Sequence, residues 1–287
     1  MNLRTLLGLT LIAGLLLFAG CKRGADSGHP TLRLSMIPTN DPGKMIRDSE
    51  LLVDYLEKET GAKVQMTIPT NYAAVVEALA NDQVDIAYLG GFTYVQASKR
   101  SGAVPLVQRD MDQNFHSLFI TNPTSGIKTL DDLKGHTFAF GDVNSTSGHL
   151  MPEYFMRQAK VDSEVIAKAI YTGGHDATAL AVANKKVDAG ALDETIYQKM
   201  VKDGKLDPNQ ASVFYTTPPY FDYVWVARKG LDAKLSEAFA NAFLKLKADD
   251  PSDKTIMEFL RATKYVEAKD SDYDKLRQAA KDAGLMK

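Results

Sequence analysis

Two runs of small polar residues hold the best candidates for binding chemistry in this sequence. The first run is Ser145-Thr146-Ser147, which follows Gly141 and directly precedes a helical stretch. The first backbone N–H groups of a helix have no partner within the helix, and the helix dipole favours negative charge there. Hydroxyl groups together with these amides suit a phosphate-like oxyanion. Plain N-capping is the alternative, because serine and threonine precede many helices that bind nothing.

The second run is Thr172-Gly173-Gly174-His175, which again lies between an expected strand and an expected helix. The imidazole of His175 can donate a hydrogen bond to an oxyanion in its neutral or its charged form. A capping or surface histidine is the alternative. If both runs face one cleft, they predict a site that holds a tetrahedral anion without a cluster of Lys or Arg.

Alternating strand-like and helical stretches predict the α/β fold that would position these runs. After a strand at 224–227 that returns the chain to its first lobe, only helices are expected. The expected elements used below are strands at 32–37, 84–89 and 224–227 and helices at 44–60, 147–159 and 176–183.

A chain that starts in one lobe, builds a second and returns makes two crossovers, which form a hinge. We therefore expect lobe 1 at 31–117 and 226–287 and lobe 2 at 118–225. The predicted fold class is α/β, with a cleft between two mixed, mainly parallel sheets and a two-strand hinge.

The composition excludes several classes of protein. The chain has 287 residues, of which 45% are hydrophobic and 24% charged, so disorder and multiple membrane spans are not expected. The 34 Lys and Arg against 36 Asp and Glu give a formal net charge of -2. This balance provides no basic field for a polyanion, so we expect no nucleic-acid partner.

The N-terminus has the pattern of an export signal. Arg4 precedes an apolar run at 6–18, which is too short to span a membrane, and residues 1–20 are the expected signal peptide. The stretch 17–21 resembles a bacterial lipobox, which implies that Cys21 is lipidated and that 21–30 is a flexible tether. An ordinary signal with an incidental cysteine is the alternative. As the only cysteine, Cys21 excludes an internal disulfide.

Catalytic and metal motifs are missing from the sequence. A hydrolase with Ser145 or Ser147 as nucleophile and His175 as base is an alternative, but no third member completes a triad. The histidines show no ligand spacing for zinc. We therefore expect neither an enzyme, nor a metal site, nor a cofactor.

The two polar runs also carry a resemblance to a known family. Ser-Thr-Ser-Gly-x-x-x-Pro at 145–152 and Gly-His-x-x-x-Ala-x-Ala-Val-Ala at 174–183 are similar to motifs of the periplasmic phosphonate and phosphite binding proteins of ABC importers. Stretches at 71–77, 84–90 and 131–135 match as well, so the similarity covers about Leu32 to Ala227. The resemblance implies a type II periplasmic-binding-protein fold.

The resemblance also implies roles for particular residues. Ser145, Thr146 and Ser147 would bind the phosphoryl oxygens through their hydroxyl groups and backbone N–H groups. Tyr72 and His175 would donate from the walls of the site, and Asp222 would accept a proton from the ligand's P–OH. Relatives often carry a tyrosine where this chain has Phe115, which makes the pocket edge more apolar.

A further departure concerns the ligand's substituent. Binders of aminoalkylphosphonates use an acid to hold the ligand's ammonium, and Thr195 stands at the aligned position here. An aminoalkyl ligand is therefore disfavoured, although Asp193 or Glu194 takes that place if the alignment shifts by one or two residues.

Together these features predict a lipoprotein that closes its lobes on phosphite or a short alkylphosphonate, with phosphate also open. It would deliver the ligand to a membrane permease and its ATPase. We expect an exported monomer, anchored through Cys21 to the lipid bilayer of a bacterial membrane and facing the periplasm or the cell exterior. A lipid-anchored sensor with the same fold is the alternative.

Overall fold

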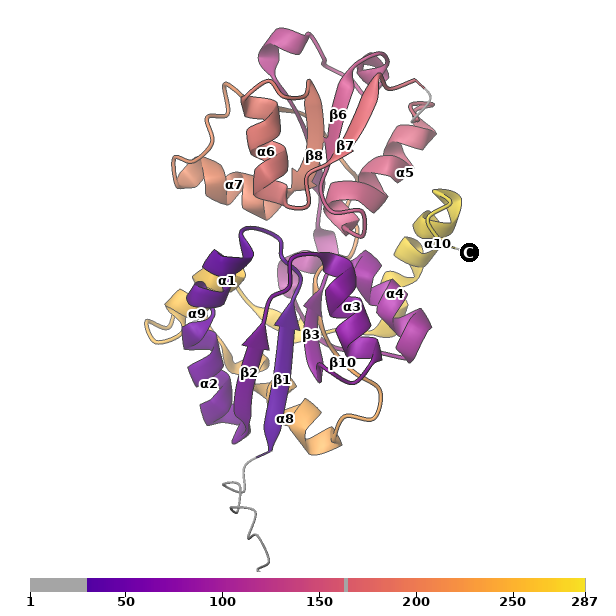
Figure 1. Cartoon of the computed structure of the whole chain (residues 1–287). Coiled ribbons are helices and arrows are strands. Elements are labelled where there is room, and N and C mark those ends of the chain that lie inside the picture. Colours follow the sequence, from indigo (N-terminus) through magenta and orange to yellow (C-terminus); the bar gives the residue numbers. More distant parts are fainter. Residues whose placement is uncertain (1–29, 163–164, 287) are drawn as a thin grey trace, which may run out of the picture.

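Two open β-sheets form the framework of the computed structural model, which describes residues 30–162 and 165–286 (Figure 1). The strand order is β11-β4-β10-β3-β1-β2 in the first sheet and β7-β6-β8-β5-β9 in the second. The strands are β1 Thr31–Met36, β2 Lys63–Thr67, β3 Ile86–Leu89, β4 Val104–Arg109, β5 Ser117–Thr121, β6 Thr137–Phe140, β7 Lys168–Tyr171, β8 Ala189–Asp193, β9 Ser212–Thr216, β10 Val224–Ala227 and β11 Tyr265–Glu267.

Both sheets are mixed, as predicted. Parallel pairs do not predominate, however, because four pairings between described strands are parallel and five are antiparallel. The strands β5 and β10, which follow the crossovers, run antiparallel to both of their neighbours. A strand that enters a sheet from the other lobe need not follow the direction set by right-handed βαβ connections.

Helices flank each sheet, and their apolar faces complete the cores. In the first lobe, α2 and α8 pack together on one side of the sheet and α3 and α4 on the other (Figure 1). The α-helices are α1 Pro42–Asp48, α2 Glu50–Thr60, α3 Tyr72–Ala80, α4 Gly91–Ser101, α5 Met151–Gln158, α6 His175–Ala183, α7 Glu194–Lys202, α8 Ala233–Lys245, α9 Lys254–Leu260 and α10 Asp274–Asp282.

Two crossovers join the lobes, one between β4 and β5 and one between β9 and β10. They meet in an antiparallel bridge, in which the Phe115 N–H donates to the Tyr220 carbonyl over 2.9 Å and the Tyr220 N–H donates to the Phe115 carbonyl over 3.0 Å. The predicted two-strand hinge is thereby confirmed. Ser117, expected at the end of the first part of lobe 1, lies in the second sheet. Val224 and Trp225, expected at the end of lobe 2, lie in the first sheet. The limits of the domains stay a prediction.

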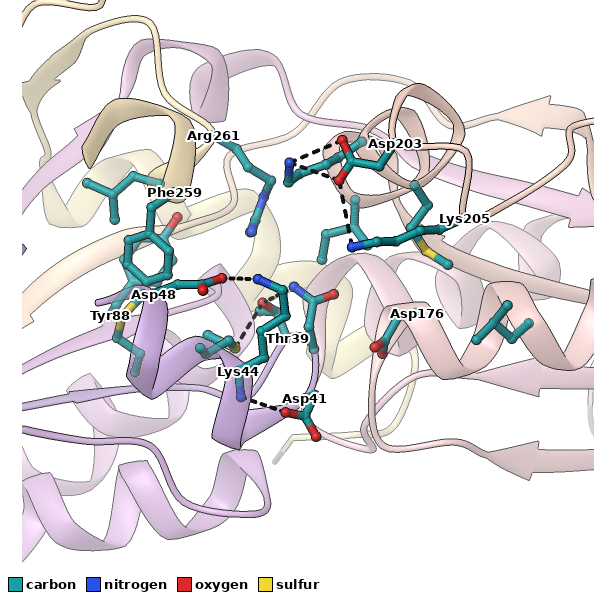
Figure 2. Close-up of a pocket in the computed structure, with 18 residues that line it drawn as sticks. Thr39, Asp41, Lys44, Asp48, Tyr88, Asp176, Asp203, Lys205, Phe259 and Arg261 are labelled. Carbon is teal, nitrogen blue, oxygen red and sulfur yellow. Dashed lines mark hydrogen bonds and ion pairs between the residues drawn. The ribbon is translucent and has the colours of Figure 1, made fainter. Parts of the chain in front are cut away.

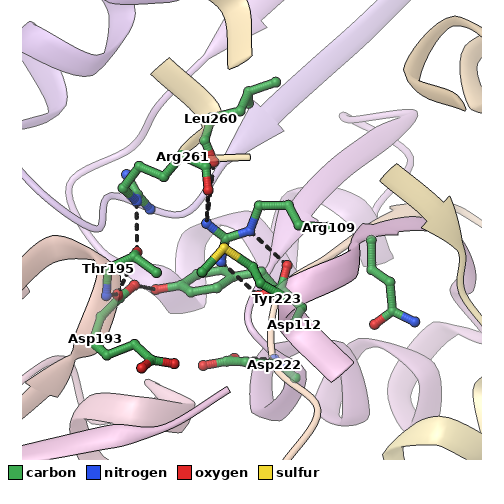
Figure 3. A network of polar contacts seen from close by, with 12 residues as sticks. Arg109, Asp112, Asp193, Thr195, Asp222, Tyr223, Leu260 and Arg261 are labelled. Atoms are coloured by element: carbon green, nitrogen blue, oxygen red, sulfur yellow. Dashed lines mark hydrogen bonds and ion pairs between the residues drawn. The ribbon is translucent and has the colours of Figure 1, made fainter. Parts of the chain in front are cut away.

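A buried ion pair stands beside this hinge (Figure 3). Arg109 at the end of β4 donates to both carboxylate oxygens of Asp112, over 2.7 and 2.6 Å, and both residues are fully buried. The remaining guanidinium nitrogen donates to the carbonyls of Leu260 and Arg261, over 3.2 Å each. Burial alone would lower the pKa of Arg109, but the charge of Asp112 raises it well above its usual value. The pair therefore ties the hinge to the C-terminal helices.

Three expectations about the elements are wrong in detail. The expected helix at 44–60 is two helices, α1 and α2, because the hydroxyl and N–H of Ser49 bond back to carbonyls of α1. The expected helix at 147–159 starts with a π-turn, Thr146–Leu150, before α5. The segment after β10 is not only helical, because β11 pairs with β4; its three residues are too few to show a strand period.

Besides β11, the elements β4, β9 and α7 were not expected. The signal peptide, the lipobox and Cys21 lie outside the described residues. Among the residues that the structure describes, no helix is long and apolar enough to span a membrane.

Candidate functional site

The loop after β6 presents the Ser-Thr-Ser run between the lobes, and its three hydroxyl groups differ in their hydrogen bonding. The Ser145 oxygen accepts the N–H of Gly148 over 3.0 Å, so Ser145 is an N-cap, as the alternative interpretation held. The Thr146 oxygen accepts the N–H of Phe92, at the start of α4 in the other lobe, over 3.0 Å. The Ser147 hydroxyl is buried and has no hydrogen-bond partner among the described residues. A buried hydroxyl without a partner is costly, which makes Ser147 a candidate donor to a ligand.

The second run places His175 at the first position of α6, fully buried. Its Nδ1 accepts the backbone N–H of Asp193 over 3.2 Å, so Nδ1 carries no proton and the proton of the neutral ring is on Nε2. Burial lowers the pKa of His175, which keeps the ring neutral at pH 7. Nε2 lies 3.4 Å from the hydroxyl of Tyr72 and 3.5 Å from that of Tyr223. His175 is therefore a neutral donor directed at the same region as the two phenols.

Tyr72 reaches this region from the first lobe. Asn71 caps α3 by accepting the N–H of Ala74, as the sequence predicts, and this cap places Tyr72 at the first helical position. The Tyr72 backbone N–H donates to Asp142 of the second lobe over 3.3 Å. Burial raises the pKa of Tyr72 well above its usual value, so its hydroxyl remains a neutral donor.

Asp222 lies on the crossover that leads into β10, and it is buried. One carboxyl oxygen accepts the N–H of Gly91 at the start of α4 over 3.0 Å, and the other has no partner among the described residues. Burial raises the pKa of Asp222 to about 8. A side chain at Gly90 would approach Thr146 Oγ1 to 2.9 Å and Asp222 Oδ1 to 3.2 Å, so only glycine allows these groups to meet.

The structure thus brings six of the seven predicted binding residues to one buried region between the lobes. Phe115 lies apart from them in the hinge. Its ring packs edge-on against Tyr220 and Tyr223, with centroid distances of 6.2 and 5.6 Å. Phe115 therefore meets the polar cluster only through the ring of Tyr223.

The sequence interpretation missed Tyr223, and it considered Asp193 only as an acid for a ligand's ammonium group. Tyr223 donates to Asp193 Oδ2 over 2.9 Å and lies against His175, and Asp193 in turn sets the tautomer of His175. Tyr223 directly follows Asp222, so an aromatic donor beside a candidate acid was the available signal. Nothing in the local sequence shows that Asp193 and His175 are neighbours.

The carboxylate of Asp193 already has a full set of partners. Oδ1 accepts the N–H groups of Thr195 and Ile196 and the Thr195 hydroxyl, and Oδ2 accepts Tyr223. Glu194 accepts the N–H of His116, away from the polar cluster. Neither carboxylate offers a free oxygen pair for a ligand's ammonium group, and the expectation that aminoalkyl ligands are disfavoured stays a prediction.

Hydrogen bonds across the cleft hold the lobes together around this region. The His175 N–H donates to the Thr39 carbonyl over 3.1 Å, and Gln96 donates to Asn144 over 3.0 Å. The Arg261 Nε donates to the Thr195 hydroxyl over 3.0 Å (Figure 3). The lobes are therefore in contact, as a binding protein's lobes are in its closed form.

Neither serine is arranged with His175 as a nucleophile and its base. Within 30–162 and 165–286, no hydrogen bond joins His175 to Ser145 or Ser147. No group of three or more His, Cys, Asp or Glu side chains in these ranges is placed to hold a metal ion.

Comparison with known proteins assigns the family. Residues 34–273 match the family model described as ABC transporter, phosphonate, periplasmic substrate-binding protein. The chain belongs to this family. The family consists of substrate-binding transport proteins rather than enzymes, and its members are periplasmic.

Individual relatives of this phosphonate-binding family agree with the assignment. The chain is 31% identical to the probable ABC transporter phosphite binding protein PhnD1 of Prochlorococcus marinus (strain MIT 9301), over 93% of this chain and 95% of the relative. It is 27% identical to the phosphonates-binding periplasmic protein of Escherichia coli (strain K12), over 89% and 78% of the two chains.

Solved structures of the family have the same fold. The structure of PhnD1 from Prochlorococcus marinus in complex with methylphosphonate matches with a TM-score of 0.85 at 29% identity, and the match covers 89% of this chain and 99% of that one. A binding-protein component of an ABC phosphonate transporter from Pseudomonas aeruginosa matches with a TM-score of 0.80 at 25% identity, over 89% and 87%.

Proposed function

We propose that this protein captures a small phosphorus oxyanion, phosphite or a short alkylphosphonate ahead of phosphate, for an ABC importer. The ligand would lie among Tyr72, Ser145–Ser147, His175 and Asp222, where both lobes contribute. Phe115 would make the pocket edge apolar through Tyr223. The lobes close on the ligand, and the closed form is what a membrane permease and its ATPase would receive.

The observation that carries this proposal is a pair of buried atoms without partners. The Ser147 hydroxyl and the second oxygen of Asp222 are both buried and unbonded among the described residues. Most buried polar side chains in folded proteins have a partner. A tetrahedral anion that bears one proton supplies what both atoms lack, since its oxygens accept from Ser147 and its P–OH pairs with Asp222.

Asp222 would also set the protonation state of the complex. Because its pKa is about 8, the carboxyl is mostly protonated at pH 7 in the ligand-free protein. The complex can be written as a protonated Asp222 with a dianionic ligand or as an ionised Asp222 with a monoanionic ligand. Both forms hold one proton between the carboxyl and the ligand. One proton shared between the carboxyl and the ligand therefore keeps two negative charges from meeting in the buried site.

Neutral donors suit a carrier that must release its cargo. Hydrogen bonds to a charged group contribute about 1.5–3 kcal/mol each. A few such bonds, less the costs of association and lobe closure, give micromolar retention, which corresponds to about -8 kcal/mol. A buried Arg or Lys would add a full charge that holds the anion more tightly.

Thermal unfolding with a ligand panel tests the proposal. The protein without residues 1–20 is heated with phosphite, methylphosphonate, aminoethylphosphonate or phosphate. A ligand at one hundred times its Kd adds about 2.7 kcal/mol of stability. We expect the largest shifts with phosphite and methylphosphonate. No shift with any of the four would contradict the assignment.

The anchor and the partners form a separate part of the proposal. Cys21 would carry the lipid that holds an exported, monomeric protein on the bacterial membrane through the tether at 21–30. Labelled palmitate should be incorporated into the wild-type chain and not into Cys21→Ala. Equal labelling of both chains would contradict lipidation at Cys21.

A further inference from the structure

A cavity of about 400 Å³ lies between the lobes, next to the proposed anion site (Figure 2). Lobe 1 contributes the end of β1, the start of α1 and the end of α9, and lobe 2 contributes α6 and α7. We call this cavity the lateral groove. Its lining contains none of the residues that we assign to the anion site.

Two stacked aromatic rings separate the lateral groove from the anion site. Tyr88 lines the groove, and its ring stacks on Tyr223 with a centroid distance of 5.3 Å and an interplanar angle of 10°. Tyr223 in turn lies against His175. The groove is therefore a compartment of its own, with one wall shared with the anion site.

The lining of the lateral groove combines apolar with charged side chains, and its volume is that of a small-molecule site. Ligand pockets in proteins are typically about 300–1,000 Å³, mostly apolar, with a few polar groups that orient the ligand. Apolar lining residues are Met36, Met45, Ile196, Met200, Phe259 and Leu260.

One side chain at the groove keeps donors without partners among the described residues. Arg261 uses only Nε, toward Thr195, and its two terminal nitrogens have no partner within 30–162 and 165–286.

The other cations of the lateral groove are already paired. Lys44 bonds to Asp48, and both Lys199 and Lys205 lie within ion-pair distance of Asp203. Arg261 is therefore the cation of the groove that has no carboxylate partner among the described residues, and an acceptor with a negative charge complements it.

Two further carboxylates lie at the groove. Asp41 accepts the N–H of Lys44, and Asp176 accepts the N–H of Ala177. Each therefore bonds to the first turn of its own helix, where the helix dipole stabilises a negative charge.

We propose that the lateral groove is a second ligand site, which takes an organic monocarboxylate with an apolar body. The carboxylate accepts from the terminal nitrogens of Arg261, and the apolar body covers the apolar side chains of the lining. Arg261 stands at the end of α9 in lobe 1 and already reaches Thr195 in lobe 2, so an anion held there contacts both lobes. Such a ligand favours the closed form, and by linkage it and the phosphorus oxyanion each raise the affinity of the other.

Isothermal titration with three probes of one shape tests the proposal. The probes are 3-phenylpropionate, 3-phenylpropanol and 3-phenylpropylamine, titrated into the mature protein saturated with methylphosphonate. We expect the acid to bind with a Kd of about 1 mM or tighter and the alcohol to bind at least tenfold more weakly. An amine that binds as well as the acid, or an acid that does not bind, overturns the proposal.

Three variants locate the binding. Arg261→Gln should weaken the acid at least tenfold and remove the difference between acid and alcohol. Leu180→Trp, on the exposed side of α6 within the groove lining, should block all three probes. Leu244→Trp, similarly exposed on α8 outside that lining, is the matched control and should bind the acid like the wild type. Binding of the acid that survives Leu180→Trp would place it elsewhere.

The same experiment separates this proposal from the proposed function. The first titration, with methylphosphonate alone, reports on the anion site. If it shows no binding, the phosphorus-oxyanion assignment fails, and the three probes are titrated into the ligand-free protein, where the predicted order is unchanged. If methylphosphonate binds and the acid does not, the lateral-groove proposal fails and the proposed function stands.

Discussion

Two buried polar clusters lie close together at the hinge, and they differ in whether the protein completes them (Figure 3). In the first, the guanidinium of Arg109 has a two-point ion pair with Asp112 and two carbonyl acceptors. In the second, Asp222 and Ser147 each keep a buried atom without a partner among the described residues.

A buried polar group whose partners all come from the protein has a structural role, whereas one that lacks a partner is a candidate for binding a ligand. Burying a charge is tolerated when partners replace water, as they do at Arg109. A half-satisfied cluster costs stability in the ligand-free protein and regains it when the missing partner arrives. We therefore assign the first cluster to the hinge and the second to binding.

The largest expected effect comes from breaking the complete cluster. Arg109→Met leaves Asp112 buried without its cation, which should lower the free energy of unfolding by about 3–5 kcal/mol. Thermal and urea unfolding of the ligand-free protein measure this loss. The double variant Arg109→Met with Asp112→Leu should recover much of it, because no charge is then left alone. Equal stability of the single variant and the wild type would mean that the pair does not support the hinge.

Removing a group from the incomplete cluster should lower the affinity for the ligand and leave the stability of the ligand-free protein nearly unchanged. Ser147→Ala deletes a hydroxyl that has no partner in the ligand-free protein, so its melting temperature should stay near the wild-type value. Its affinity for methylphosphonate should fall about tenfold or more, since one hydrogen bond to a charged ligand is lost. Titration calorimetry measures the affinity.

Ser145→Ala is the matched control for stability. Its oxygen caps the turn by accepting from Gly148, so this substitution should lower the free energy of unfolding by about 0.5–2 kcal/mol. A result in which Ser147→Ala loses stability and keeps its affinity would reverse our assignment of the two serines.

Asp222→Asn tests the proton in the incomplete cluster. The pKa of about 8 in the folded protein lies above the ordinary value of 3.8 for an aspartic acid, so this carboxyl favours folding fully below pH 3.8, and the contribution is lost as the pH rises through 8. Asp222→Asn cannot ionise, so the ligand-free variant should melt higher than the wild type at pH 8–9. Melting curves between pH 5 and pH 9 check this.

The affinity of the wild type for methylphosphonate should fall above about pH 8, where an ionised Asp222 repels the anion. The amide of the Asp222→Asn variant cannot ionise, so the affinity of this variant should fall less above pH 8. Parallel pH profiles for the two proteins would count against the proton-sharing account.

The smallest expected effect comes from a bond at the edge of the cleft. Gln96 donates to Asn144 across the lobes from a partly buried position. A net hydrogen bond contributes about 0.5–1.5 kcal/mol, so Gln96→Ala should weaken methylphosphonate binding by about two- to tenfold and leave ligand-free unfolding nearly unchanged. An effect as large as that of Ser147→Ala would show that closure, more than contact with the ligand, sets the affinity.

The regular elements could be predicted where apolar periodicity and capping signals agree. Asn71 marks the start of α3, and the buried run that ends at Leu89 marks β3. The three-residue strand β11 could not be predicted, because it is a strand only through its pairing with β4. The break between α1 and α2 depends on the back-bonding of Ser49, which an apolar pattern does not report.

The candidate site was predictable in its residues and not in its contacts. The Ser-Thr-Ser run, Tyr72, His175 and Asp222 were accessible from the motifs. The placement of Phe115 in the hinge, the control of the His175 tautomer by Asp193 and the contribution of Tyr223 depend on residues that are far apart in the chain. The roles of all these residues in binding stay predictions.

By itself, the sequence determined the local chemistry of this protein: the α/β alternation, the two polar turns before helices and the family to which they belong. Only the tertiary structure decided which of the three hydroxyl groups in one turn is a cap, which bridges the lobes and which is left open. The physical reason is that a hydrogen bond needs its partner within about 3 Å. The chain brings such partners together from both lobes only when it folds.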